Sequence, residues 1–68
     1  MQNMIILTPR QKQILEFASR GETHTTIGQI LGLRRNTVCV HVQRMFQTMG
    51  ADNMAHAVAI GFRHGLLR

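Results

Sequence analysis

The stretch between residues 36 and 49 carries two periodic patterns of apolar residues. Valine at every second position over 38–42 is typical of a half-buried strand. An apolar residue at every third or fourth position is instead typical of one helix face, and this pattern includes Val38, Val42, Met45 and Met49. The rest of the chain predicts short helices, and a strand without a partner leaves its backbone groups unsatisfied. We therefore predict a helix over this stretch.

The segment "TPRQ", residues 8–11, carries the start signals of an earlier helix. Thr8 is a typical N-cap, Pro9 suits the first helical position, and Gln11 lies three residues after the cap. Gly21 provides the stop. The buried face predicted for this helix consists of Ile14, Leu15 and Ala18.

Two more helices are predicted, one before and one after the stretch 36–49. Thr23 caps the first of them and Gly32 ends it, while Gly28 permits a close approach by a neighbouring helix. The apolar stripe of this helix is Ile27, Ile30 and Leu31. The last helix is expected to begin at Asp52 as its cap and to end at Gly65. The predicted fold is therefore all-α, with four short helices.

The length of 68 residues predicts one domain with a small core and marginal stability. We assign residues 1–6 to an N-terminal arm and residues 7–68 to the domain, and we expect the "MIIL" stretch at residues 4–7 to pack onto the core. The single cysteine excludes an internal disulfide, and no apolar run approaches the ~18 residues needed to span a membrane. A lone thiol and the lack of a signal peptide favour the cytoplasm.

The charge balance points to a nucleic-acid partner. Eight basic residues, seven of them arginine, stand against three acidic ones, which gives a net charge of +5. Arginine makes bidentate contacts with phosphates and with guanine edges. A basic footprint on so small a surface is typical of nucleic-acid binding.

The predicted outward face of the helix over 36–49 fits a major groove. With about 100° per residue, its pole opposite the core holds Asn36, Val40, Gln43 and Gln47. Thr37 and Arg44 flank this face on one edge, and Cys39 flanks it on the other. Amides pair with adenine, valine contacts a thymine methyl, and basic neighbours hold phosphates. A short helix, a glycine-containing turn and a longer helix also match the helix-turn-helix plan.

The last predicted helix has two apolar stripes. The core stripe is Met54, Ala57, Val58 and Gly61. The second stripe is Ala55, Ala59 and Phe62. A helix with two apolar stripes favours a second partner, and symmetric dimers are the commonest assembly. We therefore predict a homodimer through the second stripe.

The spacing of the cysteine and the histidines along the chain argues against a catalytic or metal site. Cys39 and His41 point about 200° apart on a helix, so they form no thiol–imidazole dyad. The four histidines include no i, i+4 pair, which argues against a metal site. We predict no enzymatic activity, no metal and no cofactor.

The sequence resembles the DNA-binding domain of LuxR/GerE-type bacterial regulators over residues 7–67. The segments that carry this resemblance are "LTPRQKQILEFASRGETHTTIGQILGL", "TVCVHV", "MG" and "AVAIGFRHGLL". The positions that fit the family frame are Leu7, Thr8, Arg10, Leu15, Gly21, Ile27, Leu31, Thr37, Val38, His41, Gly50, Ala57, Val58, Gly65 and Leu66.

The resemblance implies that the third helix reads the major groove and that the fourth forms the dimer contact. Together with the helical wheel, it makes the following residues candidates to face bases: Asn36, Cys39, Val40, Gln43 and Gln47. Candidates to contact the DNA backbone are Arg10, Thr25, Arg34, Arg35, Thr37, His41 and Arg44.

Several positions depart from the family pattern. Arg34 stands where a serine usually caps the third helix, so we expect Asn36 to cap it two residues later. Cys39 stands where a lysine or arginine is common, so the base preference of the family is not transferred. Charged residues are common in the family at five further positions. Here these positions hold the neutral residues Gln11, Gln13, Thr26, Thr48 and Met54. We expect neutral packing in place of that charged network.

The sequence leaves three functions open. The first is a sequence-specific regulator that binds double-stranded DNA as a small stand-alone dimer, without the sensor or receiver domain of typical relatives. The second is a protein-interaction module that pairs through its last helix with a larger LuxR-type regulator and inhibits it. The third is a domain similar to region four of sigma factors, against which the "AVAIGFRHGLL" helix argues.

Overall fold

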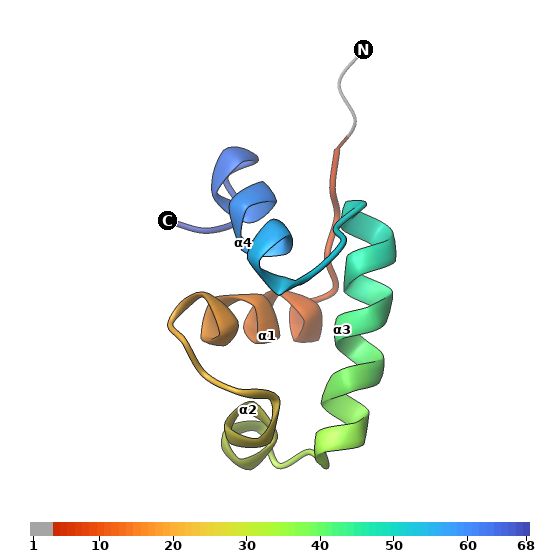
Figure 1. Ribbon diagram of the computed structural model, residues 1–68, viewed down its shortest axis with the longest axis vertical. Coiled ribbons are helices and arrows are strands. Elements are labelled where there is room, and N and C mark those ends of the chain that lie inside the picture. Colours follow the sequence, from red (N-terminus) through yellow and green to blue (C-terminus); the bar gives the residue numbers. More distant parts are fainter. Residues whose placement is uncertain (1–3) are drawn as a thin grey trace.

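A computed structural model describes residues 4–68 as four helices with no strand among them (Figure 1). The helices are α1 (Pro9–Ser19), α2 (His24–Leu31), α3 (Arg35–Met49) and α4 (Met54–Arg63). In Figure 1, α3 runs along one side, α1 crosses the centre, and α2 and α4 lie at opposite ends. None of these helices has the length and apolar character needed to cross a membrane, in the part of the chain described. The all-α prediction, including a helix over 36–49, is confirmed.

The start of α1 follows the predicted capping box. The Gln11 backbone N–H donates to the Thr8 hydroxyl oxygen at 3.1 Å, and the Thr8 N–H donates to Oε1 of Gln11 at 3.0 Å. Two backbone donors that have no partner inside the helix are therefore satisfied by local side chains. Gln11 is buried at 8% exposure, so the amide replaces a glutamate here without placing a charge next to the core.

The core consists of two clusters that meet along α3. One contains Ile14, Ile27, Val38 and Val42, and joins α1, α2 and the first half of α3. The other joins α1 to the second half of α3, to α4 and to the end of the chain, through Leu15, Met45, Met49, Ala57, Ile60 and Leu67. Phe46 and Met54 pack against both clusters. Met54 thus occupies an apolar environment, as expected for neutral packing in place of a charged network.

The turn between α2 and α3 depends on two glycines. At Gly28 a β-carbon would lie 2.5 Å from the Leu33 carbonyl oxygen and 3.6 Å from Val38 Cγ2. Gly32 ends α2 in the left-handed conformation at φ 70°, and the Leu33 N–H then donates to the Gly28 oxygen at 2.8 Å. The tight approach at Gly28 is therefore made by the backbone of the turn, whereas the predicted contact with the neighbouring helix is an ordinary van der Waals contact with Val38 of α3.

The start of α3 differs from the prediction. The helix begins at Arg35 with Arg34 as its N-cap, and no side chain caps it. Asn36 was expected to be the cap, but it lies inside the first turn and is exposed. The packing of Val38 against α2 starts the helix one residue before Asn36, so its side chain no longer precedes the free N–H groups.

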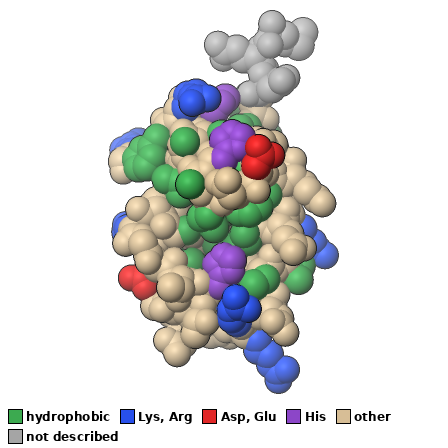
Figure 2. Space-filling model, in the orientation of Figure 1, with side chains coloured by type: hydrophobic (Ala, Val, Ile, Leu, Met, Phe, Trp, Pro, Cys, Tyr) green, Lys and Arg blue, Asp and Glu red, His purple; other side chains and the backbone are tan. Residues whose placement is uncertain are grey.

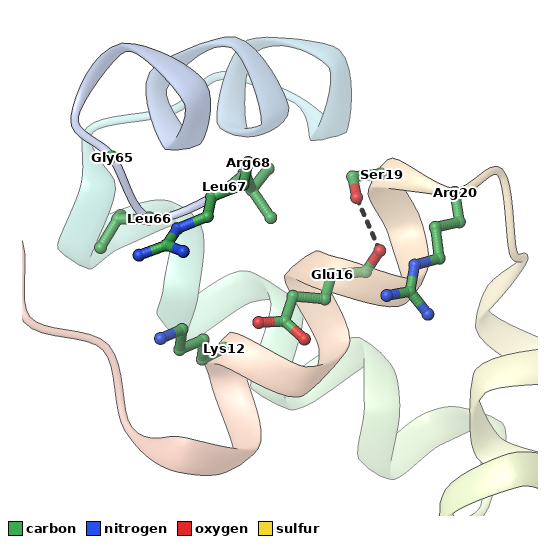
Figure 3. Close-up of a pocket in the computed structure, with 8 residues that line it drawn as sticks. All are labelled: Lys12, Glu16, Ser19, Arg20, Gly65, Leu66, Leu67 and Arg68. Carbon is green, nitrogen blue, oxygen red and sulfur yellow. Dashed lines mark hydrogen bonds between the residues drawn. The ribbon is translucent and has the colours of Figure 1, made fainter.

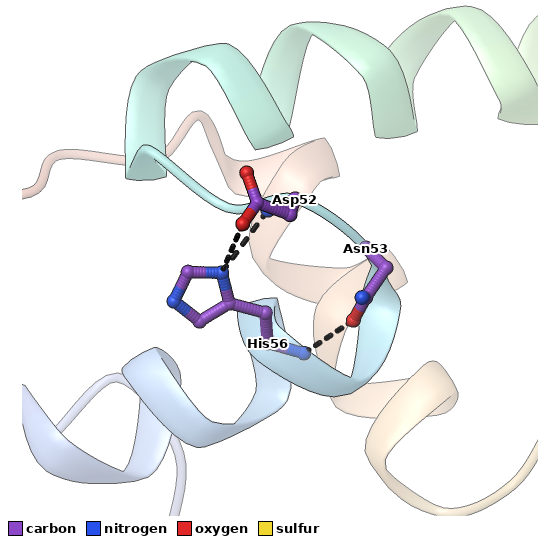
Figure 4. Close-up of polar contacts among 3 residues, drawn as sticks. All are labelled: Asp52, Asn53 and His56. Carbon is purple, nitrogen blue, oxygen red and sulfur yellow. Dashed lines mark hydrogen bonds and ion pairs between the residues drawn. The ribbon is translucent and has the colours of Figure 1, made fainter.

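The start of α4 also differs by one residue. Asn53, and not Asp52, is the N-cap, since its Oδ1 accepts from the His56 N–H at 2.8 Å. The imidazole of His56 folds back over this turn, where its Nδ1 accepts from the Asp52 N–H at 3.1 Å (Figure 4). A backbone N–H can only donate, so Nδ1 is unprotonated in this arrangement. The Asp52 carboxylate lies 3.8 Å from the same nitrogen.

The end of α4 and the apolar stripe of α2 also differ from the prediction. The last helix ends at Arg63 with His64 as its C-cap, two residues before Gly65. Ile30 is 51% exposed, so it does not belong to the buried stripe of α2 with Ile27. Within α4, Ile60 is 7% exposed and belongs to the core, although it was not in the predicted core stripe.

The described part of the N-terminal arm is extended, with alternating burial. Ile5 and Leu7 pack against the core cluster of α1, α3 and α4, as predicted for the "MIIL" stretch. Met4 and Ile6 point the other way and are 83% and 74% exposed. Residues 1–3 of the predicted arm lie outside the described residues.

Candidate nucleic-acid interface

The outward face of α3 is short, exposed and largely uncharged. The opposite side of the helix is buried, with Val38 and Met45 at 0% exposure. Four residues predicted to face bases are therefore directed to solvent: Asn36, Val40, Gln43 and Gln47. Val40 is 46% exposed and belongs to neither core cluster. The face thus offers three amides and one apolar contact to a ligand.

Cys39, the fifth predicted base-facing residue, is only half-buried and is held by a second helix. Its Sγ lies 3.4 Å from Nδ1 of His24 at the start of α2. This contact joins the two helices of the helix-turn-helix unit at the edge of the outward face. The spacing of Cys39 and His41 could be judged from the sequence, but the partner His24 could not be predicted, because a contact over 15 residues leaves no periodic signal.

Basic side chains flank the outward face of α3 at its start and past its middle. Arg34 is exposed at the N-cap and Arg35 is exposed at the first position of α3, and Arg44 is exposed in the second half of the helix. Arg10 is half-buried in the first turn of α1. Figure 2 shows basic side chains around the edges of the molecule, with some at the lower end, where α2 meets the start of α3. The arginines at the start of α3 thus lie next to the uncharged face.

The remaining predicted backbone contacts occupy α2 and α3. Thr25 and Thr37 are exposed in the first turns of these two helices, while His41 is half-buried. The first turn of α3 has no side-chain cap, so its free N–H groups are open to an acceptor. Exposed hydroxyl and N–H groups at the starts of helices are able to donate hydrogen bonds to the oxygen atoms of a phosphate.

This surface combines neutral hydrogen-bonding groups with basic side chains. Within residues 4–68, no group of three or more His, Cys, Asp and Glu side chains is placed to hold a metal ion. Neutral hydrogen-bond donors and acceptors lie beside arginine side chains. This combination favours a polyanion that also carries hydrogen-bonding groups along its edges.

The second apolar stripe of α4 is exposed, as the pattern predicted. Ala55, Ala59 and Phe62 are all directed to solvent, and Phe62 is 51% exposed. The other side of α4 packs into the core through Ala57 and Ile60. The stripe therefore lies on a different side of the helix from the core contacts.

Comparisons with known proteins agree with this architecture. The bacterial regulatory proteins of the luxR family match residues 5–60. Among curated relatives, the transcriptional activator protein BjaR1 of Bradyrhizobium diazoefficiens is 36% identical over 61 residues, which cover 90% of this chain and 25% of the relative. The transcriptional activator protein EchR of Dickeya chrysanthemi is 33% identical over 63 residues, which cover 93% and 25%.

A solved structure shares the fold. The structure of the transcription factor GerE superposes with a TM-score of 0.86 over 97% of each chain, at 23% sequence identity. The chain spans about a quarter of the length of the curated relatives that it matches. The family match selects this family over the region-four domain of sigma factors. The chain therefore belongs to the LuxR family of bacterial regulatory proteins and has the four-helix fold of the GerE helix-turn-helix domain.

Proposed function

We propose that this protein is a sequence-specific, double-stranded DNA-binding transcription regulator that acts as a homodimer. The observation that carries the proposal is the outward face of α3, which presents amides and one valine between exposed arginines. Such a face reads base edges while its neighbours hold the phosphates. A regulator of this kind works where the chromosome lies, so we also propose a cytoplasmic location.

The base contacts follow from the chemistry of each side chain. The amides of Gln43, Gln47 and Asn36 each have a donor and an acceptor, which match N6 and N7 of adenine in the major groove. Val40 offers a methyl surface to the C5-methyl group of thymine. Cys39 lies at the edge, where its contact with His24 limits the directions of the thiol.

The phosphate contacts follow from position and charge. Arg34, Arg35 and Arg44 lie on α3 or immediately before it, and Arg10 lies in the first turn of α1. Thr25, Thr37 and His41 add neutral hydrogen-bonding groups, and the uncapped first turn of α3 adds backbone donors. These contacts carry no base information, so they set affinity and register.

The proposal is tested by selecting duplexes from a random-sequence library and comparing the winners with unselected DNA by fluorescence anisotropy. A regulator of this kind binds its selected site at least ~10³-fold more tightly than random DNA. Equal affinity for both would contradict sequence-specific recognition and favour the protein-interaction alternative.

Replacing Gln43 with alanine is expected to weaken binding to a selected duplex by about 1–3 kcal/mol per half-site. Binding to random DNA should change little, because Gln43 contacts bases and not phosphates. Anisotropy titrations on both duplexes measure the two effects. Gln13→Ala is the matched control, since Gln13 is an exposed glutamine on α1 outside the proposed interface. An equal loss on both duplexes would refute the reading role of Gln43.

We propose that Ala55, Ala59 and Phe62 form the contact between two copies of the chain. Phe62→Ala is expected to raise the dimer Kd about 30-fold, because burying the exposed half of two phenyl rings is worth about 2 kcal/mol. Sedimentation equilibrium measures this change. Arg63→Ala is the control, since Arg63 is the exposed neighbour on α4 outside the stripe. An equal dimer Kd for the two variants would place the contact elsewhere.

The exposed stripe of α4 also supports the alternative, in which the chain pairs with a larger LuxR-type regulator and inhibits it. Mixing the purified protein with such a regulator separates the two functions. Stable heterodimers that fail to bind DNA would favour inhibition, whereas DNA-bound homodimers favour the main proposal. Action without an attached sensor domain stays a prediction, since the relatives are about four times longer.

A further inference from the structure

A pocket lies between α1 and the end of the chain, away from α3. Its volume is about 310 Å³, and its walls are α1 on one side and residues 65–68 on the other (Figure 3). In Figure 1 the C-terminus lies on the opposite side of the molecule from α3. The pocket therefore does not belong to the proposed DNA interface.

The wall formed by the chain end is fixed by the fold. The Leu66 and Leu67 N–H groups both donate to the Gly61 carbonyl oxygen, at 2.7 and 3.0 Å. Leu67 is 6% exposed, and its Cδ1 would lie 2.8 Å from a β-carbon at Gly61. These contacts fix Leu66 and Leu67 against α4, and Leu67 shares a core cluster with Leu15 of α1, which places this wall beside α1.

The pocket carries more positive than negative side chains. Lys12, Arg20 and Arg68 are exposed at its rim, and Glu16 is the only acidic residue in its lining. Within residues 4–68, the only contact within 4.0 Å between a carboxylate and a basic side chain joins Asp52 and His56, so these cations have no carboxylate partner at that distance.

The polar lining also limits what kind of anion fits. The Ser19 hydroxyl donates to the Glu16 backbone oxygen at 2.6 Å, so its proton is already used within α1. Donors to an anion must therefore come from the lysine and the two arginines. The Glu16 carboxylate lies between Lys12 and Arg20, where it disfavours a compact ion such as phosphate and offers an acceptor to an N–H group of a ligand.

We propose that this pocket docks an acidic peptide segment of a partner protein. Glutamate and aspartate side chains of the segment would meet Lys12, Arg20 and Arg68, while a backbone N–H of the segment donates to Glu16. Because the pocket and α3 lie on opposite sides, the segment and a duplex would bind at the same time. The proposal stands independently of sequence-specific DNA recognition.

The test uses a fluorescein-labelled peptide rich in glutamate, and the same peptide with glutamine in place of every glutamate. Anisotropy at moderate salt, about 150 mM, is expected to show binding of the glutamate peptide only. The double variant Lys12→Gln/Arg20→Gln should weaken this binding about tenfold, at a few-fold for each exposed charge. Both side chains are exposed, so the variant should unfold at the same temperature as the wild type, which circular dichroism checks.

The matched control is Arg34→Gln/Arg35→Gln, which removes the same net charge from the start of α3. This variant should keep peptide affinity within about twofold, because screening at moderate salt limits attraction between distant exposed charges. Equal losses in the two double variants would overturn the proposal, since net charge alone would explain the binding. Displacement of the peptide by inorganic phosphate, or its complete loss on a saturating duplex, would overturn it as well.

Discussion

Replacing Gly28 with alanine is expected to lower the free energy of unfolding by about 2 kcal/mol or more. The added β-carbon would lie 2.5 Å from the Leu33 carbonyl oxygen, which is part of the backbone and cannot rotate away. Alanine in place of glycine gains about 1 kcal/mol of intrinsic helix stability, so the steric cost must exceed this gain. In a domain of this size the loss is a large share of the total stability.

Urea unfolding followed by circular dichroism measures this loss. Gln29→Ala is the matched control, since Gln29 is the next residue of α2 and is exposed. It should change the free energy of unfolding by no more than about 0.5 kcal/mol. A Gly28→Ala protein as stable as the wild type would show that the turn between α2 and α3 moves freely enough to admit a methyl group.

DNA affinity is expected to fall about 10⁴-fold between about 50 and 200 mM salt, for random and selected duplexes alike. The physical reason is release of the counterions that neutralise DNA phosphates. The proposed phosphate contacts are four arginines in each of two protomers: Arg10, Arg34, Arg35 and Arg44. Eight such contacts give a slope of about −7 for log affinity against log salt concentration.

The slope also tests individual residues. Arg35→Gln should make it about two units shallower, because each protomer loses one phosphate contact. Arg63→Gln is the control, since Arg63 lies at the end of α4 and has no proposed DNA contact. Titrations at several salt concentrations give the two slopes. A slope unchanged by Arg35→Gln would remove this arginine from the interface.

The local parts of this fold could be predicted because their signals lie within a few residues. The capping box of Thr8 and Gln11 depends on groups three residues apart, and the structure shows both of its hydrogen bonds. The buried face of α3 follows from a repeat along one helix. The caps of α3 and α4 were misplaced, since several polar residues near each start compete. Tertiary packing then selects the residue at which each helix begins.

The exposed face of α3 could be predicted from the same repeat, because burial of one side of a helix leaves the other side free. The contacts that residues of this face make within the domain could not be predicted in this way. The contact between Cys39 and His24 joins α2 to α3, and no pattern along the chain marks it. The pocket beside Lys12 likewise needs the chain end to return to α1.

The sequence by itself determined the four helices, the residues that form most of the core and the outward face of α3. These depend on local capping and on helical periodicity, whose reach is a few residues. Only the tertiary structure decided where α3 and α4 begin, how closely the turn after α2 approaches Gly28, and which side chains meet across helices. Those features depend on contacts between distant residues, whose geometry arises only when the whole core packs together.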